Sequence, residues 1–353
     1  MLGILRTFQP RLVNWYRIHR RDLPWRTPVG IRPDPYHVLV SETMLQQTQV
    51  ATVTPYFQRF IGRYPTLADL ATADQQQVLQ LWQGLGYYSR ASNLLKAAQK
   101  VLADFNCRIP QTVPELLSLP GVGRYTAGAI ASLAFGRRQP ILDGNVIRVL
   151  CRIDAIENDP SLASTRGKLW QRAEEILPRT NAADFNSALM ELGATVCTPR
   201  IPACQACPVR LHCQAHALRI QDRLPVRTPR KVRPIERRWI FCIAHAGRFL
   251  IEQRPAKGRW AGLWQFVTLP ANGEPAGRIL RSAIGLQLGR LRPLGRFIHD
   301  LTHRQYEFQV YRCTATGDVA DVAPRVWISP GELADYPLPQ PHLRAAKLLL
   351  DPR

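Results

Sequence analysis

The stretch LSLPGVGRYTAGAIASLAF, residues 117–135, decides the fold of the N-terminal part of the chain. It joins a helix expected to end near Leu119 to one expected to begin near Thr126, through the turn Pro120-Gly121-Val122-Gly123. Glycine lets the backbone turn tightly, and the free amides at the start of the second helix attract anions. The pattern predicts a helix–hairpin–helix with an anion site, although a Gly-x-Gly turn alone is more often a plain corner.

The rest of the first 220 residues shows helical periodicity. Apolar residues recur at steps of three and four in VLVSETMLQQTQVATVTPYFQRFI, QQQVLQLWQGL and KLWQRAEEIL. Further on, ERRWIFCIAHAGRFLIEQR predicts two strands around an Ala-Gly turn, QYEFQVYRC alternates like a strand, and AGRILRSAIG is typical of a helix. Between the two patterns, QDRLPVRTPRKVRPI is basic and proline-rich, which favours an extended connector. We expect an all-α domain over 1–220, a linker over 221–235 and an α+β domain over 236–353.

The chain carries a large positive charge. Lys and Arg number 47 against 26 Asp and Glu, so 47 − 26 gives a formal charge of +21. This excess indicates a polyanionic partner such as nucleic acid, although a solvated basic surface would give the same count. No run of about 18 apolar residues and no signal peptide is present, so we expect an intracellular, cytoplasmic protein without a membrane partner.

Four of the eight cysteines crowd into residues 197–213, with six, two and five residues between successive members. A zinc site of four thiolates usually presents two separated Cys-x-x-Cys pairs, whereas this loop holds one pair with flanking cysteines. The spacing therefore favours a 4Fe–4S cluster, with zinc as the alternative. The four expected ligands are Cys197, Cys204, Cys207 and Cys213.

Two carboxylates stand in unusual surroundings. Glu42 lies in the mostly apolar segment VSETMLQQTQV, where an acid is costly unless it is paired or functional. Asp143 in PILDGNVIRVL suits a helix N-cap. Each has an ordinary structural explanation on its own. Together they match what cleavage of a glycosidic bond needs, namely a protonated acid for the leaving group and a negative charge for the cationic sugar.

LPGVGRYTAGAI with the downstream LDGNV resembles the helix–hairpin–helix DNA glycosylases, and the cysteine loop is similar to that of their iron–sulfur branch. With LPWR (23–26), GLGYYSRASNL and the second domain, the chain closely resembles the MutY family of adenine DNA glycosylases. The resemblance implies an all-α helix–hairpin–helix domain with a 4Fe–4S cluster loop, followed by an α+β Nudix-like domain. It also implies a monomer that removes adenine opposite 8-oxoguanine or guanine in double-stranded DNA, in association with the nucleoid.

The resemblance assigns catalytic roles to four positions. Glu42 matches the general acid, Asp143 the aspartate that stabilises the oxocarbenium-like sugar, and Asn145 an asparagine that orients these groups. Tyr125 occupies the position where bifunctional relatives carry a nucleophilic lysine. Because tyrosine forms no Schiff base, we expect base removal without efficient strand cleavage.

The resemblance also implies DNA contacts in both domains. Side chains at two positions would enter the base stack beside the oxidised guanine, the hairpin would hold a phosphate, and the turn at 301–303 would inspect the lesion. These DNA-binding residues are Gln47, Tyr87, Gly121, Val122, Gly123, Thr302 and His303.

This sequence departs from the family pattern in three places. Leu301-Thr302-His303 stands where the family reads Phe-Ser-His, and Ser187 stands where the family has Gln or Glu. The segment TPVGIRPDP (27–35) is longer than usual. The second domain also lacks the acidic Nudix box, since ILRSAIGLQL contains no acid, so we expect recognition rather than nucleotide hydrolysis there.

Two other functions are compatible with parts of the sequence. A thymine or uracil mismatch glycosylase on the same scaffold can also carry tyrosine at position 125, but such relatives usually lack the domain at 236–353. A non-enzymatic mismatch-binding protein would use both carboxylates as caps, although a binder has no need for a buried acid.

Overall fold

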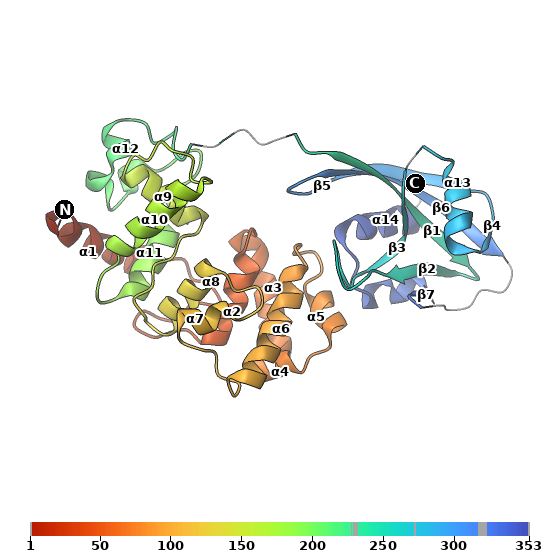
Figure 1. Cartoon of the computed structure of the whole chain (residues 1–353), viewed down its shortest axis with the longest axis horizontal. Helices are drawn as coiled ribbons and strands as arrows, with labels where there is room; N and C mark the ends of the chain where they lie inside the picture. The colour runs from red at the N-terminus through yellow and green to blue at the C-terminus, as the bar shows by residue number, and fades with distance from the viewer. Residues whose placement is uncertain (1, 227, 229–231, 272, 317–322, 352–353) are drawn as a thin grey trace. The chain divides into compact units, whose positions relative to one another are not determined.

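A computed structural model describes residues 2–226, 228, 232–271, 273–316 and 323–351 (Figure 1). The chain divides into two compact units. The first combines Met1–Thr72 with Lys96–Pro229, and the second combines Ala73–Leu95 with Arg230–Arg353. Each unit has its own hydrophobic core.

The first unit is helical, which confirms the expected fold class of this part of the chain. None of the described helices has both the length and the apolar character that a membrane span requires. Its elements are α1 (Leu2–His19), α2 (Pro35–Leu45), α3 (Val50–Arg63), α4 (Leu67–Ala71), the C-terminal part of α6 (Ser89–Asp104), α7 (Val113–Leu117), α8 (Arg124–Ala129), the π-helix η1 (Ile130–Ala134), α9 (Gly144–Ile153), α10 (Ala163–Glu175), α11 (Ala182–Thr195), η2 (Cys204–Ala206), η3 (Arg210–His212) and α12 (Gln214–Ala217).

The apolar periodicity from Val38 to Ile61 belongs to two helices, α2 and α3, separated by a turn. α2 begins after Asp34, whose side chain accepts the amide of Tyr36 at 2.6 Å, and Pro35 occupies the first helical position. The hairpin lies between α7 and α8, and Gly121 adopts a φ of 79° that favours glycine. The expected helix–hairpin–helix is therefore present. α7 ends at Leu117 and α8 begins at Arg124, each two residues earlier than the sequence indicated.

α9 and α11 form the centre of this unit and carry much of the site described below. α11 packs against α1 and α9. Leu12, Leu150 and Phe185 are completely buried where these helices meet. At the α9–α11 crossing, a Cβ on Gly193 would lie 2.6 Å from the Cβ of Asn145, so only glycine permits this close approach.

The second unit is built on a mixed sheet. In the described residues the strand order is β4-β6-β1-β3-β2-β7, with β5 paired to β6. β1 and β6 run parallel, from Ile235 opposite Gln305 to Ala244 opposite Thr314. The elements are α5 (Gln75–Leu81), the N-terminal part of α6, β1 (Ile235–His245), β2 (Arg248–Gln253), β3 (Trp264–Pro270), α13 (Ala276–Ile284), β4 (Gln287–Leu288), β5 (Arg292–Asp300), β6 (Gln305–Thr316), β7 (Arg325–Ile328), η4 (Pro330–Asp335) and α14 (Gln340–Leu350).

The alternation in β1 explains why both faces of this sheet are covered. Ile240 and Cys242 belong to the core that α14 closes, whereas Phe241 and Ile243 belong to the core that contains Leu280 of α13. β1 and β2 turn at Ala246-Gly247, both with positive φ. The two expected strands around that turn, the strand QYEFQVYRC and the helix AGRILRSAIG are confirmed.

Residues 73–95 group with the C-terminal part of the chain rather than with their sequence neighbours. Gln76 explains part of this grouping, because its side chain donates to the carbonyl of Gly262 at 3.0 Å and accepts from the indole of Trp264 at 3.1 Å. No change of composition marks this segment in the sequence. The domain limits 1–220, 221–235 and 236–353 stay a prediction, and within the expected linker residues 227 and 229–231 lie outside the described residues.

Candidate active site

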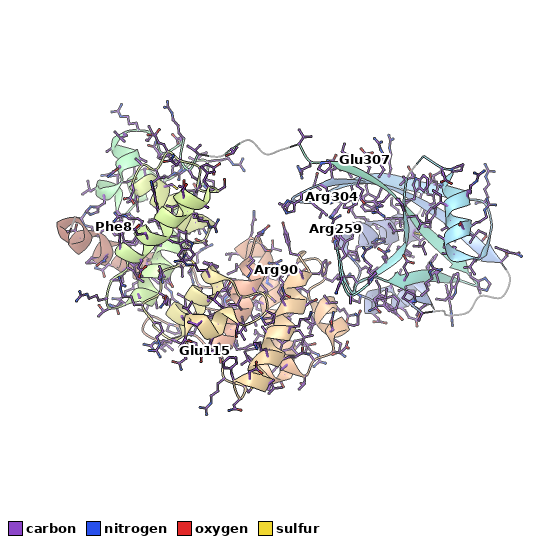
Figure 2. The ribbon with its side chains drawn as sticks, viewed as in Figure 1. Phe8, Arg90, Glu115, Arg259, Arg304 and Glu307 are labelled. Carbon is purple, nitrogen blue, oxygen red and sulfur yellow. The ribbon has the colours of Figure 1, made fainter. Side chains whose placement is uncertain are left out.

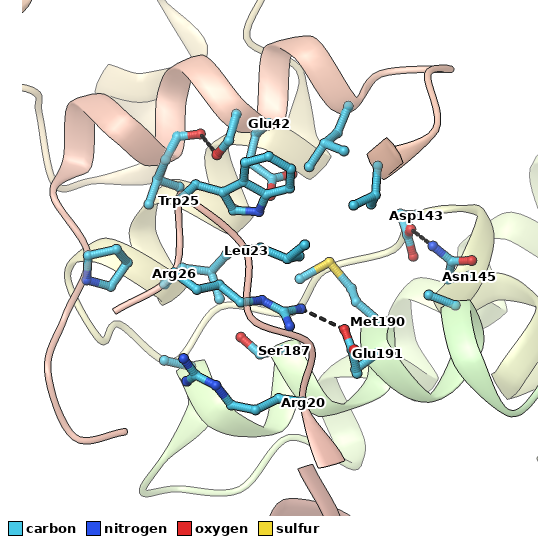
Figure 3. Close-up of a pocket in the computed structure, with 18 of the residues that line it drawn as sticks. Arg20, Leu23, Trp25, Arg26, Glu42, Asp143, Asn145, Ser187, Met190 and Glu191 are labelled. Carbon is cyan, nitrogen blue, oxygen red and sulfur yellow. Dashed lines mark hydrogen bonds and ion pairs between the residues drawn. The ribbon is translucent and has the colours of Figure 1, made fainter. Parts of the chain in front are cut away.

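A cavity of about 1380 Å³ opens in the first unit (Figure 3). Its walls are formed by the segment 16–33, by α2 and the turn after it, by the hairpin, by the first turn of α9 and by α11. Glu42, Tyr125, Asp143 and Asn145 all line it, so the structure brings together the four residues to which the resemblance assigns catalysis.

Glu42 is held in a nearly water-free position. It lies on α2, is 5% exposed, and accepts a hydrogen bond from the Tyr125 hydroxyl on α8 at 2.5 Å. Burial raises the pKa of Glu42 to about 7, with a further upward contribution from the negative charge of Asp143. The Tyr125 hydrogen bond and the charge of Arg26 act in the opposite direction. A carboxyl with this pKa is present in both protonation states at neutral pH.

Asp143 is the N-cap of α9. Its side chain accepts the amide of Val146 at 2.7 Å and the side-chain amide of Asn145 at 2.8 Å. Burial raises the pKa of Asp143, while these hydrogen bonds and the charge of Arg148 oppose the rise. Asp143 therefore caps α9, as expected from the sequence, and also presents a carboxylate to the cavity.

Arg148, one turn after Asn145 on α9, holds the Asn145 side chain that donates to Asp143. It is 7% exposed and donates to the Asn145 side-chain oxygen at 2.8 Å, to the Gly193 carbonyl at 2.6 Å and to the Cys197 carbonyl at 2.7 Å. Arg148 thus connects the carboxylate end of the cavity to the first residue of the cysteine loop. Sequence reasoning missed it, although its spacing of three from Asn145 within an apolar helix was a usable signal.

Glu191 on α11 forms the second charged cluster of the cavity. It is completely buried and pairs with Arg21 and with Arg26, each at 2.7 Å. Figure 3 shows the Arg26–Glu191 pair and, one helical turn before Glu191, the side chain of Ser187. Among the described residues Ser187 makes no side-chain hydrogen bond, and it lines the same cavity as Arg26. Arg21 and Glu191 were also missed from the sequence.

The residues expected to contact DNA divide between the two units. In the first unit, Gln47 and the hairpin residues Gly121 and Gly123 line the cavity, whereas Val122 is buried and its amide donates to the Leu119 carbonyl at 3.1 Å. Gln47 has a φ of 58°, which is uncommon for a residue other than glycine.

In the second unit, Tyr87 also has a left-handed backbone, with a φ of 50°, and is 47% exposed. The Tyr87 hydroxyl is 2.6 Å from that of Thr302. His303 is exposed beside Thr302. Strained backbone at exposed aromatic or polar residues is typical of functional sites. The structure therefore joins one residue expected in the base stack to the turn expected to inspect the lesion.

The four loop cysteines form no disulfide bond and lie within range of one another's charge. Arg152, 1% exposed, donates to the Cys197 sulfur at 3.3 Å and to the Thr198 carbonyl at 2.7 Å. In the described part of the chain, no three His, Cys, Asp or Glu side chains are placed to hold a single metal ion. In a 4Fe–4S cluster each thiolate binds a different iron, so the donor set does not need to converge on one point.

Replacing Glu191 by Gln tests the buried charge cluster. Arg21 and Arg26 would lose the completely buried carboxylate that they share, so we expect the free energy of unfolding to fall by about 2 kcal/mol or more in urea titrations. Asp184→Asn is the matched control, because it breaks the Arg17–Asp184 pair at 2.8 Å, whose side chains are 40% and 29% exposed. We expect that variant to change stability by less than about 1 kcal/mol. If both variants lost the same free energy of unfolding, the buried Glu191 cluster would not be more important for stability than an exposed ion pair.

Comparisons with known proteins agree with this geometry. A family model for HhH-GPD superfamily base excision DNA repair proteins matches residues 40–175, and a NUDIX domain model matches residues 238–348. The structure of a thermostable thymine-DNA glycosylase is similar to 62% of this chain and 98% of that chain, with a TM-score of 0.55 and 30% identity.

Two adenine DNA glycosylases match over a longer part of this chain. The adenine DNA glycosylase of Rattus norvegicus is 40% identical over 365 residues, which cover 88% of this chain and 71% of the relative. The adenine DNA glycosylase of Homo sapiens is 39% identical over 369 residues, covering 88% and 67%. Since these matches extend through both units and most of each relative, the chain belongs to the adenine DNA glycosylase family.

Proposed function

We propose that this protein hydrolyses the N-glycosidic bond of adenine in double-stranded DNA where adenine lies opposite 8-oxoguanine or guanine. The observation that carries the proposal is the pairing of Glu42, buried and with a pKa of about 7, with the α9-capping carboxylate of Asp143 in one cavity. Two acids in different environments divide the roles of proton donor and charge stabiliser. The names of the relatives support adenine as the base.

Glu42 in its protonated form donates its proton to the ring nitrogen at position 7 of adenine. The bond between N9 and the sugar carbon C1′ then breaks, its electron pair goes to the base, and adenine leaves as a neutral molecule. The sugar becomes an oxocarbenium-like cation. Water adds to C1′, and its released proton returns to the Glu42 carboxylate, which restores the starting state.

Asp143 stabilises the sugar cation. The Val146 amide and the Asn145 side chain fix both oxygens of Asp143 before the substrate arrives, so little reorganisation accompanies the reaction. Arg148 holds Asn145 in the orientation that donates to Asp143. The negative charge of Asp143 in turn raises the pKa of Glu42 and favours its protonated form.

Tyr125 limits the reaction to base removal. Burial and the nearby carboxylates raise the pKa of its phenol well above the ordinary value, so the side chain stays protonated. A protonated phenol donates to Glu42 but forms no Schiff base with the sugar, which is the step that leads to strand cleavage. The proposed enzyme is therefore monofunctional.

DNA contacts are proposed at the residues expected from the sequence. Opening the duplex costs a few kcal/mol per base, which inserted side chains offset in part. Gln47 and Tyr87 are suited to this insertion because each is exposed and has a left-handed backbone. Gly121, Val122 and Gly123 would hold a backbone phosphate, and Thr302 with His303 would contact the oxidised base.

A 4Fe–4S cluster is proposed at Cys197, Cys204, Cys207 and Cys213. The thiol donor set and the Arg152 guanidinium, which donates to the Cys197 sulfur at 3.3 Å, fit such a group. When bound, the cluster would cross-link the loop 197–213 and thereby fix the Cys197 carbonyl to which Arg148 donates. No step of the reaction runs through it.

Single-turnover release of adenine tests the proposed function. We expect wild-type protein to release adenine from duplexes with adenine opposite 8-oxoguanine, without strand cleavage. Glu42→Gln should slow release by roughly 10²- to 10⁴-fold, because the proton donor is lost. Glu174→Gln, an exposed position on α10, is the control and should behave like wild type. Release of thymine or uracil from mismatches with guanine, with adenine untouched, would contradict the proposal.

The pH dependence of the same rate tests the proton donor. Only protonated Glu42 acts as the acid, so the rate should fall as pH rises through about 7. Tyr125→Phe removes a hydrogen bond that lowers the pKa of Glu42, so its falling limb should move to higher pH. A limb that moves to lower pH, or a rate that rises above pH 7, would show that Glu42 is not the donor.

Metal analysis tests the cysteine loop. Purified protein should contain about four iron atoms and four sulfides per chain, in line with the stoichiometry of the cluster. Cys204→Ser should lose most of this iron and its visible absorbance, whereas Cys107→Ser, outside the loop, should retain both. One zinc per chain instead of iron would make the alternative metal correct.

A further inference from the structure

Four arginines gather in the second unit beside the turn 301–303. This arginine cluster consists of Arg238 on β1, Arg254 and Arg259 after β2, and Arg304 before β6. Figure 2 shows Arg259 and Arg304 at the same end of the unit. Burial lowers the pKa of Arg259 and of Arg254. The charges of Arg304 and Arg238 lower that of Arg259 further, those of Arg238 and Arg259 lower that of Arg254, and the charges of Glu236 and Glu252 oppose these effects.

The cluster has too few acids. Glu236 is shared, since one of its oxygens accepts from Arg238 at 2.8 Å and the other pairs with Arg304. Glu252, the other nearby acid, pairs with Arg325 at 3.4 Å and accepts from Gln265 at 2.8 Å. Arg254 is occupied by neutral acceptors, the Gln265 side chain at 2.5 Å and the Arg259 carbonyl at 2.9 Å. The four arginines therefore share the charges of two acids, Glu236 and Glu252, and the cluster keeps a net positive charge.

Two donors of the cluster are unused among the described residues. The guanidinium of Arg259 makes no hydrogen bond or ion pair and lies over the Tyr306 ring, 5.1 Å from its centroid. The Nε of Arg304 is buried and has no hydrogen-bond partner. A buried donor without a partner costs free energy, which an anion would recover. Aromatic rings also hold two of the guanidiniums in place. The Trp260 and Tyr306 ring centroids are 5.8 Å apart, and while Tyr306 lies under Arg259, the Trp260 centroid is 5.8 Å from the guanidinium carbon of Arg254.

We propose that the arginine cluster binds a backbone phosphate of the DNA strand whose base the 301–303 turn contacts. Guanidinium forks match phosphate oxygens in geometry and charge. Arg304 is two residues from Thr302, whose hydroxyl meets that of Tyr87 at 2.6 Å, so the cluster and the base-contacting residues belong to one surface of the second unit. The inference rests on the proposed function, which places DNA against that turn.

A free nucleotide offers the same phosphate chemistry, but DNA is the better match. Nucleoside di- and triphosphates usually arrive with Mg²⁺, which is held by carboxylates in proteins. α13, the helix that corresponds to the Nudix box, contains no acid. Because a phosphate contact positions a duplex without reading its sequence, the cluster would fix the register at which Thr302 and His303 meet the base.

The test uses the full chain and a duplex with 8-oxoguanine, or guanine, opposite a tetrahydrofuran abasic analogue, so that no base can be released. Affinity is measured across a series of salt concentrations for Arg259→Gln/Arg304→Gln. We expect affinity to fall roughly tenfold for both duplexes alike, and the slope of log K against log salt to decrease by about 0.9, as for one lost phosphate. Arg304→Lys keeps the charge and should retain most of the slope.

Arg237→Gln is the matched control, because Arg237 is on the same strand as Arg238 but on the other face, where it pairs with Glu307 at 2.7 Å. Its slope should equal that of wild type. Three results would overturn the proposal. The first is an unchanged slope in the double variant, and the second is a loss of affinity for the 8-oxoguanine duplex only. The third is a double variant that loses calorimetric binding of 8-oxo-dGMP while it keeps duplex binding. Adenine release at saturating enzyme separates the phosphate site from the proposed glycosylase function. If the double variant releases adenine at the wild-type rate and its salt slope is unchanged, only the phosphate site is refuted.

Discussion

A carboxyl group buried on α2 and hydrogen-bonded to the Tyr125 hydroxyl at 2.5 Å is the feature on which the rest of the first unit depends. An ionised carboxylate in such a place is costly, so Glu42 stays protonated up to about neutral pH. Tyr125 limits that effect by favouring the ionised form, and Asp143 strengthens it through its charge. The balance of these opposing contributions sets a pKa near the pH at which a proton donor is most useful.

The surrounding elements keep the two acids close yet different. α2 buries one acid, while the N-terminus of α9 gives the other an amide donor and a favourable dipole. α11 approaches α9 closely at Gly193, and Arg148 fills the crossing with hydrogen bonds to Asn145 and Cys197. The cysteine loop is therefore connected to the carboxylate end of the cavity through the hydrogen bonds of one side chain, Arg148.

Local patterns in the sequence predicted much of this arrangement. The hairpin, the Asp143 cap, the strands around Ala246-Gly247 and the buried acid at position 42 each follow from residues close together in the chain. The features that the sequence did not reveal depend on long-range contacts. Glu191 meets Arg21 from a distance of 170 residues in the chain.

The same reason explains two other omissions. Residues 73–95 join the second unit through contacts such as Gln76 with Gly262, which no local composition signals. The arginine cluster draws on three separate segments of the second unit, and each of its members alone looks like an ordinary surface arginine. Charge counting detected the excess of positive residues but could not show where that excess is concentrated.

The most direct test of this account is a titration of the Glu42 carboxyl itself. The carboxyl carbon of glutamate reports its protonation in a ¹³C NMR spectrum, and the signal is assigned by its absence in Glu42→Gln. We expect a midpoint near pH 7 for Glu42 in the free protein. A midpoint near that of an ordinary glutamate, about 4.3, would mean that the group is ionised at neutral pH and is not the proton donor.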